Sequence, residues 1–410
     1  MDLPLRNGLQ EPPVASPTLI VAPMEGVTHF PMRLWLAMVS QPKSMTSPFL
    51  RVTRAFPEHA LPELFVPELF GLRGLLPHDY ALVPQFIAGS PDCFLRATDL
   101  IPHDRSPMIE LNCGCPSPNS LGKHAGSGLL ADPELFRGTI TRLAAHLGPG
   151  RLALKMRLGL ASDDEFPALL DAVAGLPLGR LTIHARTRAD GYRSHARWPL
   201  IAAALTKTKV PIVASGDVWG LDSAAALRTM APGLHGIMIG RGLLRNPWIF
   251  REIDHGQAVT IATPTFINVL FAYLMIQDLA QRAAPTLLAK VAQQRIGRPC
   301  GTDAAAWAAQ TAALSKVALG RPMLLHQQAT PDLEQLNTLS PVAFQRLRFL
   351  WSYLRTSLPE AYADSRLGKA RSAQEFFTGL LGLSAGGGDL APLTLRHRPE
   401  WDDHFARARG

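Results

Sequence analysis

With 410 residues, 47% of them hydrophobic and 18% charged, the chain is long enough for two or three domains and too apolar for a disordered or fibrous protein. Four cysteines are too few for a disulfide framework, and neither a signal peptide nor an apolar run of about 18 to 20 residues is visible. We therefore expect a soluble, cytoplasmic protein; its net charge of +8 favours a polyanionic partner, although a GC-rich genome would also enrich arginine.

Short strand-like runs recur up to position 240, each followed by a polar or glycine-rich loop and then by a segment with helical spacing. The expected strands are residues 18–23, 43–47, 81–87, 107–112, 151–157, 180–186, 210–215 and 235–240. Several runs are almost continuously hydrophobic, which is typical of parallel strands buried on both faces. Eight such units predict an α/β fold, a (β/α)8 TIM barrel over residues 18–255 after an N-terminal segment 1–17. A doubly wound open sheet is the alternative.

Beyond the expected barrel, the sequence changes to Ala-, Leu- and Gln-rich segments with helical spacing. This change predicts a smaller all-helical C-terminal domain over residues 260–383, with an insertion at about 280–339. A glycine-rich stretch then begins a flexible tail, residues 384–410. The helical domain has 12 basic and 7 acidic residues, so much of the excess positive charge lies there.

Polar residues and glycines gather where the expected strands end. In a barrel these ends form one rim, which is where active sites are built. Glycine turns follow the last two strands, at 215–217 and 240–242, and glycine lets the backbone come close to a ligand. The pair of turns predicts a phosphate site, although two ordinary strand–helix turns are the alternative.

Three further rim residues are chemically unusual. For Cys115, zinc binding lacks enough partner ligands and a disulfide to Cys113 would be strained, which leaves a reactive thiol or an inert buried cysteine. Lys155 interrupts an apolar strand, so its ammonium should meet either an anionic ligand or a structural carboxylate. His184 is either a ligand-binding residue or a core histidine.

Taken in order, these motifs resemble the tRNA-dihydrouridine synthases. The motifs are residues 22–28 with Arg33, Gln85, residues 112–116, 155–159 and 184–187. Residues 49–52 and 346–355 are most similar to the C-type bacterial subgroup. The resemblance covers about 18–250 and resumes near 340–370, and it implies a barrel enzyme that binds FMN and has a helical C-terminal domain.

The resemblance also implies a role for each matching position. Residues expected at the flavin are Pro23, Met24, Gln85, Lys155, His184, Ser215, Gly216, Asp217, Gly240 and Arg241. Asn112 would position the uracil, and Arg157 and Arg186 are expected to bind the RNA substrate. Arg348 and Arg355 lie two turns apart on one face of the expected helix, which predicts either phosphate contacts or a solvated basic face. Cys115 would be the proton donor, and NADPH (or NADH) would reduce the flavin. No metal is implied, and we expect a monomer.

Three positions depart from the family pattern. Pro118 replaces a lysine, Ser215 replaces an asparagine and Pro48 replaces an acidic residue, while Lys123 resembles a second family lysine. The implied activity is reduction of a D-loop uridine in tRNA, at position sixteen by subgroup, with the base flipped out of the RNA. The alternatives are a catalytically impaired flavin-binding protein that binds or folds tRNA, and an FMN oxidoreductase of a free pyrimidine.

Overall fold

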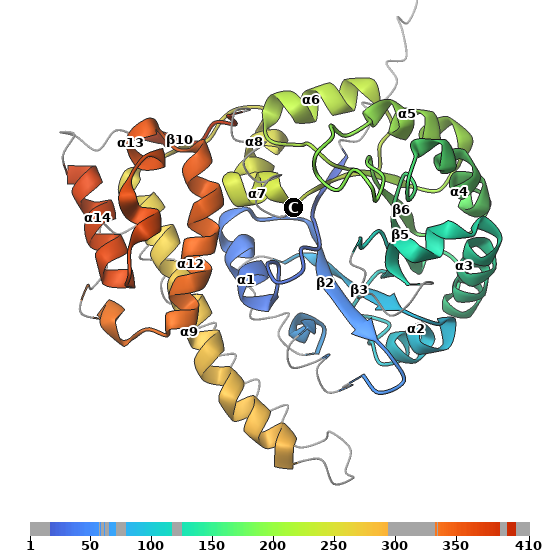
Figure 1. Ribbon diagram of the computed structural model, residues 1–410, viewed down its shortest axis with the longest axis horizontal. Helices are drawn as coiled ribbons and strands as arrows, with labels where there is room; N and C mark the ends of the chain where they lie inside the picture. The colour runs from blue at the N-terminus through green and yellow to red at the C-terminus, as the bar shows by residue number, and fades with distance from the viewer. Residues whose placement is uncertain are drawn as a thin grey trace, which may run out of the picture.

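The computed structural model contains a closed barrel of eight parallel strands, with a helical region packed against one side (Figure 1). Each strand pairs with the next one in sequence, and the eighth pairs with the first. This closure confirms the TIM-barrel prediction and excludes the open sheet. The residues that the structure describes are 17–56, 58, 61, 65–70, 79–116, 125–293, 333, 335–385 and 392–398.

The strands lie where the hydrophobic runs predicted them. They are β1 (Thr18–Val21), β2 (Ser44–Val52), β3 (Ala81–Ala88), β4 (Ile109–Cys113), β5 (Leu152–Arg157), β6 (Arg180–His184), β7 (Ile212–Ser215) and β8 (Gly236–Ile239). The exception is β2, which was expected to end at Ser47. Its register shifts between Thr46 and Phe49, because Pro48 cannot donate to the ladder, and the strand then continues to Val52.

The outer layer of the barrel consists of helices. They are α1 (Phe30–Val39), α2 (Pro91–Thr98), α3 (Pro133–Leu147), α4 (Phe166–Val173), α5 (Trp198–Lys207), α6 (Leu221–Met230), α7 (Arg241–Arg245) and α8 (Ile249–His255). Proline occupies the first turn of α1 to α5, where its missing N–H is not needed. Asp132 caps α3 by accepting the N–H groups of Glu134 and Leu135. These five prolines therefore help to start the helices in which they lie.

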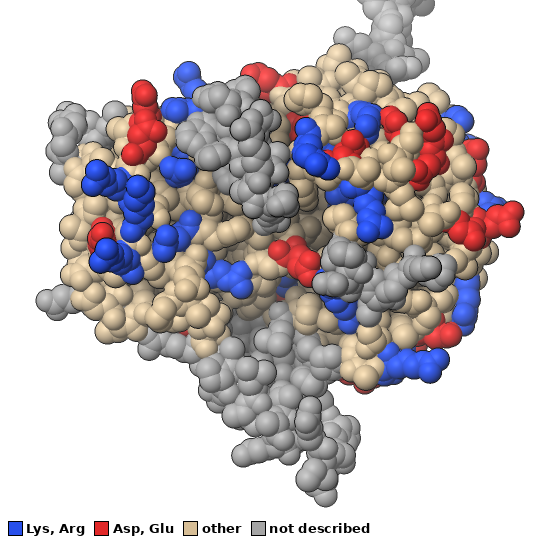
Figure 2. Space-filling view, in the orientation of Figure 1, with Lys and Arg blue, Asp and Glu red and all other residues tan. Residues whose placement is uncertain are grey.

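The helical region consists of α9 (Thr263–Gln293), α12 (Pro341–Leu354), α13 (Glu360–Ala363) and α14 (Ala373–Ala385). It packs on the barrel at two places, with α9 against α1 and α12 against α7. At the first, the Trp35 indole N–H donates a hydrogen bond to the carbonyl of Val269 at 2.9 Å. Figure 2 shows Lys and Arg side chains gathered on the visible face of this region. Because α9 continues past position 280, the expected insertion begins inside a helix; residues 294–332, including Cys300, lie outside the described part.

The structure confirms a helical C-terminal region and adds two features that the sequence did not predict. A short two-stranded sheet joins its ends, because β9 (Thr260–Ile261) pairs antiparallel with β10 (Leu393–Thr394). Residues 392–398 are also not a free tail, because Leu393 and Leu395 are buried and the Arg396 N–H donates to the carbonyl of Ser357 at 2.9 Å. Strands of two residues are too short to show any periodicity in the sequence.

A buried ion pair fixes the turn that follows β1. Arg33 and Glu68 are both almost fully buried, with 2.7 Å between Nε and Oε1. Arg33 also donates to the carbonyl of Thr28 at 2.8 Å, and the Thr28 hydroxyl accepts the N–H of Met24 at 2.8 Å. The ion pair therefore holds the 22–28 turn rigidly at the rim of the barrel.

Candidate active site

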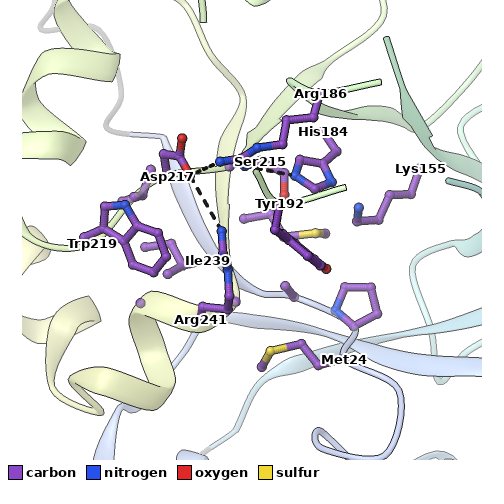
Figure 3. Close-up of a pocket in the computed structure, with 17 residues that line it drawn as sticks. Met24, Lys155, His184, Arg186, Tyr192, Ser215, Asp217, Trp219, Ile239 and Arg241 are labelled. Atoms are coloured by element: carbon purple, nitrogen blue, oxygen red, sulfur yellow. Dashed lines mark hydrogen bonds and ion pairs between the residues drawn. The ribbon is translucent and has the colours of Figure 1, made fainter. Parts of the chain in front are cut away.

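Two connected chambers open at the carboxyl ends of the barrel strands. The small chamber, about 100 Å³, lies between the glycine turns that follow β7 and β8 (Figure 3). The large chamber, about 500 Å³, contains Cys115 and Asn112. Both chambers share the lining residues Pro23, Met24, Lys155, His184, Tyr192 and Arg241. The predicted rim therefore forms one continuous site.

Glycines keep the small chamber open. Gly216 has a φ of +121°, and a Cβ built there would lie 3.0 Å from Cβ of Ala196. A Cβ on Gly240 would lie 3.4 Å from both Cβ of Ala22 and Sδ of Met24. A side chain would therefore be strained at Gly216, and both glycines line the space between the two turns, which form a cradle.

Guanidinium groups make the small chamber positive. Asp217 pairs with Arg186 at 2.6 Å and with Arg241 at 3.7 Å, while its second oxygen accepts the N–H of Ala196. Burial, followed by repulsion from Arg186, lowers the pKa of Arg241. Two guanidiniums thus share one carboxylate, and the remaining positive charge fits a phosphate. Since α7 has only five residues, side chains rather than its dipole supply most of this charge.

Lys155 brings an ammonium to both chambers. Burial lowers its pKa to about 8, and attraction to Glu110 only partly offsets this effect. Within the described part of the chain, its Nζ forms neither a hydrogen bond nor an ion pair. The structure thus presents a buried cation that borders both chambers, and its contact with an anionic ligand stays a prediction.

This placement predicts that Lys155→Met stabilises the cofactor-free protein. Because the folded pKa is about 8 and the unfolded value is 10.5, the penalty for the buried charge is complete below pH 8 and disappears as the pH rises toward 10.5. We expect a gain of up to about 3 kcal/mol at neutral pH, shrinking in alkali. The free energies of unfolding of the parent and the variant, measured in urea at neutral and at alkaline pH, give this gain. An equal gain at both pH values would contradict the assignment.

His184 is neutral near pH 7. Burial lowers its pKa well below the ordinary value, and the positive charges of Arg157 and Lys155 lower it further. Nη1 of Arg186 lies 3.4 Å from Nε2 of His184, so Nε2 accepts and Nδ1 carries the proton. His184 is therefore a neutral imidazole in the wall that the two chambers share.

The loop after β4 is held by an amide network. Oδ1 of Asn112 accepts the backbone N–H groups of Gly114 and Cys115, each at 2.9 Å. Nδ2 of Asn112 donates to Gln85 at 2.9 Å, and Gln85 donates to Glu110 at 2.6 Å. Gln85 is fully buried and supports Asn112 from below, and its expected contact with the flavin stays a prediction.

The two neighbouring cysteines have opposite surroundings. Cys115 lines the large chamber, whereas Cys113 is completely buried in the core between the barrel and its helices. Burial raises the pKa of the Cys113 thiol. Of the readings left open by the sequence, the structure favours Cys115 as the thiol available for chemistry.

The predicted substrate arginines lie in three different places. Arg157 lines the large chamber but donates to the carbonyls of Gly114 and Thr187, at 2.9 and 2.8 Å. Arg186 lies in the small chamber, paired with Asp217. Arg348 and Arg355 border a separate hollow of about 410 Å³ on the helical region. Pro118 and Lys123 lie outside the described residues.

Sequence reasoning missed three aromatic lining residues. Tyr192 borders both chambers, Trp219 the small one, and Tyr353 of α12 the large one. Aromatic residues make up only 7% of the chain, and Tyr192 and Trp219 follow strand ends, so their positions could have marked them. Tyr353 lies far from the barrel in sequence, and only the packing of α12 brings it to the chamber.

The described residues offer neither a metal site nor a membrane-spanning helix. No three His, Cys, Asp or Glu side chains among them are grouped so that they could hold a metal ion. None of the helices that the structure describes combines the length and apolarity needed to cross a membrane.

Comparison with known proteins gives consistent matches. The family model described as "Dihydrouridine synthase (Dus)" matches residues 20–341. The tRNA-dihydrouridine(16) synthase of Ralstonia nicotianae is 35% identical over 242 residues, which cover 57% of this chain and 72% of that protein. The enzyme of the same name from Cupriavidus necator is 32% identical over 266 residues, 62% and 80% of the two chains. Among solved structures, morphinone reductase aligns with a TM-score of 0.39 and 10% identity over 59% of this chain and 86% of that one, too weakly to support any argument.

Proposed function

Because this chain belongs to the dihydrouridine synthase family, we propose that it reduces uridine 16 of tRNA to 5,6-dihydrouridine, with an FMN cofactor that NADPH reduces. One observation carries this proposal beyond family membership. The Cys115 thiol and the Lys155 ammonium line a single chamber that is continuous with the glycine cradle. The thiol can donate the proton, the cation can stabilise the reduced flavin, and the cradle can hold the phosphate of the cofactor.

The residues of the small chamber fit the phosphate end of FMN. Gly216 and Gly240 leave space for it, and Arg241 supplies charge. Ser215 and Asp217 line the same wall. A ligand without an anionic end would leave the shared positive charge of Arg186 and Arg241 uncompensated.

The shared lining residues fit the ring end of the cofactor. Pro23 and Met24 supply an apolar wall on the turn after β1, and His184 adds a neutral imidazole. The ammonium of Lys155 can neutralise negative charge on the ring system, which would favour its reduced form. Binding an anionic group there would also relieve the cost of burying Lys155 alone.

The chemistry follows from these positions. A reduced flavin, when bound, supplies the hydride for C6 of the uracil. Cys115 gives its proton to C5, so that hydride and proton together saturate the C5=C6 double bond. The resulting thiolate is stabilised by Lys155 and Arg157, both of which lie within electrostatic range of Cys115. The thiolate regains its proton from solvent before the next turnover.

The helical region supports an RNA substrate. Tyr353 of α12 completes the large chamber, so RNA over this helix would lie beside Cys115. Arg348, Arg366, Lys369 and Arg371 are exposed on this region. Figure 2 shows Lys and Arg side chains gathered on its visible face. We assign Arg348 and Arg355 to phosphate contacts that hold the tRNA while its uridine is extruded into the large chamber.

The experiment is a comparison of tRNA nucleosides by position, using mass spectrometry, from cells with and without this gene. We expect dihydrouridine at position 16 to disappear in its absence and to return with the parent gene. Purified protein should oxidise NADPH faster when unmodified tRNA is added. Unchanged dihydrouridine in the deleted strain would refute the function, and stimulation by a free pyrimidine instead of tRNA would favour a free-pyrimidine oxidoreductase.

A further inference from the structure

We propose that Trp219 and His397 brace Arg241 for binding the cofactor phosphate, so that His397, near the C-terminus, is a functional part of the cofactor site. This inference rests on the proposed FMN cofactor. It concerns positioning residues, since Trp219 and His397 act through Arg241. His397 and the rest of the 392–398 segment also lie beyond residues 20–341, the part of the chain that the family model matches.

Two aromatic rings enclose the guanidinium of Arg241. Its Cζ lies 4.5 Å from the ring centroid of Tyr192 and 4.7 Å from that of Trp219. Figure 3 shows Arg241 between these two side chains at the edge of the small chamber. Because both faces are covered, the N–H groups, which lie in the guanidinium plane, remain for Asp217 and for an anionic ligand.

The Trp219 ring is in turn held from the C-terminal side. The His397 imidazole stacks on it, with centroids 5.4 Å apart and an interplanar angle of 3°. Cζ of Arg245 lies 4.4 Å from the Trp219 centroid, and Nη1 of Arg245 lies 3.4 Å from Nδ1 of His397. Trp219 therefore cannot move away from Arg241 without breaking these contacts.

The chain segment that precedes His397 is anchored and so fixes the position of this residue. The β10–β9 pairing and the buried side chains of Leu393 and Leu395 fix the segment just before it. The Arg396 N–H donates to Ser357, which follows α12. The segment thus links the helical region to the loop after β7, and the rigidity of this link is what the brace requires.

Binding of FMN and of riboflavin tests the inference, because the two ligands differ only in the phosphate. The full-length protein, freed of cofactor, is titrated with each flavin, and quenching of flavin fluorescence gives the dissociation constants. We expect Trp219→Ala to weaken FMN binding about tenfold, and Trp219→Phe and His397→Ala about threefold. Riboflavin binding should change less than about twofold in each. Arg396→Ala, which removes an exposed charge from the same segment, is the matched control.

Each outcome decides a separate point. If the variants bind FMN and riboflavin equally more weakly than the parent does, Trp219 only supports the fold. Unchanged FMN binding by Trp219→Ala and His397→Ala would also overturn the proposed brace. Melting followed by circular dichroism identifies a variant that fails to fold. If Trp219→Ala does not fold, FMN binding by the milder variants Trp219→Phe and His397→Ala decides whether the brace exists. A parent protein that binds neither flavin would instead refute the proposed function, and this inference with it.

Discussion

Replacing Cys115 by alanine should slow the reduction of tRNA uridine by about 10² to 10⁴-fold while FMN remains bound, because general acid catalysis contributes a factor of that size. The thiol lines the large chamber, and the glycine cradle of the small chamber does not include it. The measurement is a single turnover, in which reduced enzyme is mixed with unmodified tRNA and flavin reoxidation is followed by absorbance. Bound flavin is determined separately from the spectrum of the purified variant.

The chain offers both a competing proton donor and a matched control for this experiment. Lys155, with a pKa of about 8, lines the same chamber and could donate a proton in place of Cys115. A Cys115→Ala variant as fast as the parent would therefore reject the thiol and leave Lys155 as the acid. Cys113→Ala removes a thiol two residues away that is buried in the outer core. It should lower stability without the same loss of rate.

Residues at the carboxyl ends of strands were the predictable part of the site. Hydrophobic runs located all eight barrel strands, and the parallel topology then places every strand end on one rim. Lys155, His184 and Cys115 consequently border the chambers as expected. The sequence could identify these residues because strand position alone determines where they lie.

The remaining features depend on packing between distant segments. Gln85 ends up beneath the site because Glu110 and Asn112 occupy both ends of its amide, which no local pattern reveals. Tyr353 and His397 reach the barrel only through the docking of α12 and the β9–β10 pairing. The β9–β10 pairing joins residues more than 100 positions apart, and periodicity over a short window contains no information about any of these contacts.

The largest expected loss of stability comes from replacing Glu110, which lies in the barrel interior and is linked to the Cys115 loop through Gln85 and Asn112. Its carboxylate is fully buried and accepts from Arg180 at 2.9 Å and from Gln85 at 2.6 Å. Glu110→Gln keeps the shape but leaves the Arg180 guanidinium without a counterion in a low-dielectric interior. Breaking one side of a buried ion pair costs about 3–5 kcal/mol, so we expect a loss of that size in the free energy of unfolding in urea.

The same substitution at the surface separates burial from the change of residue type. Glu58 pairs with Arg96 at 2.8 Å, and both side chains are about half exposed. Glu58→Gln should therefore cost less than about 1 kcal/mol, because water screens the pair and solvates either partner alone. Adding Arg180→Met to Glu110→Gln removes the stranded charge and should recover part of the lost stability. Equal losses for the Glu58 and Glu110 variants would mean that the buried carboxylate is not the counterion on which Arg180 depends.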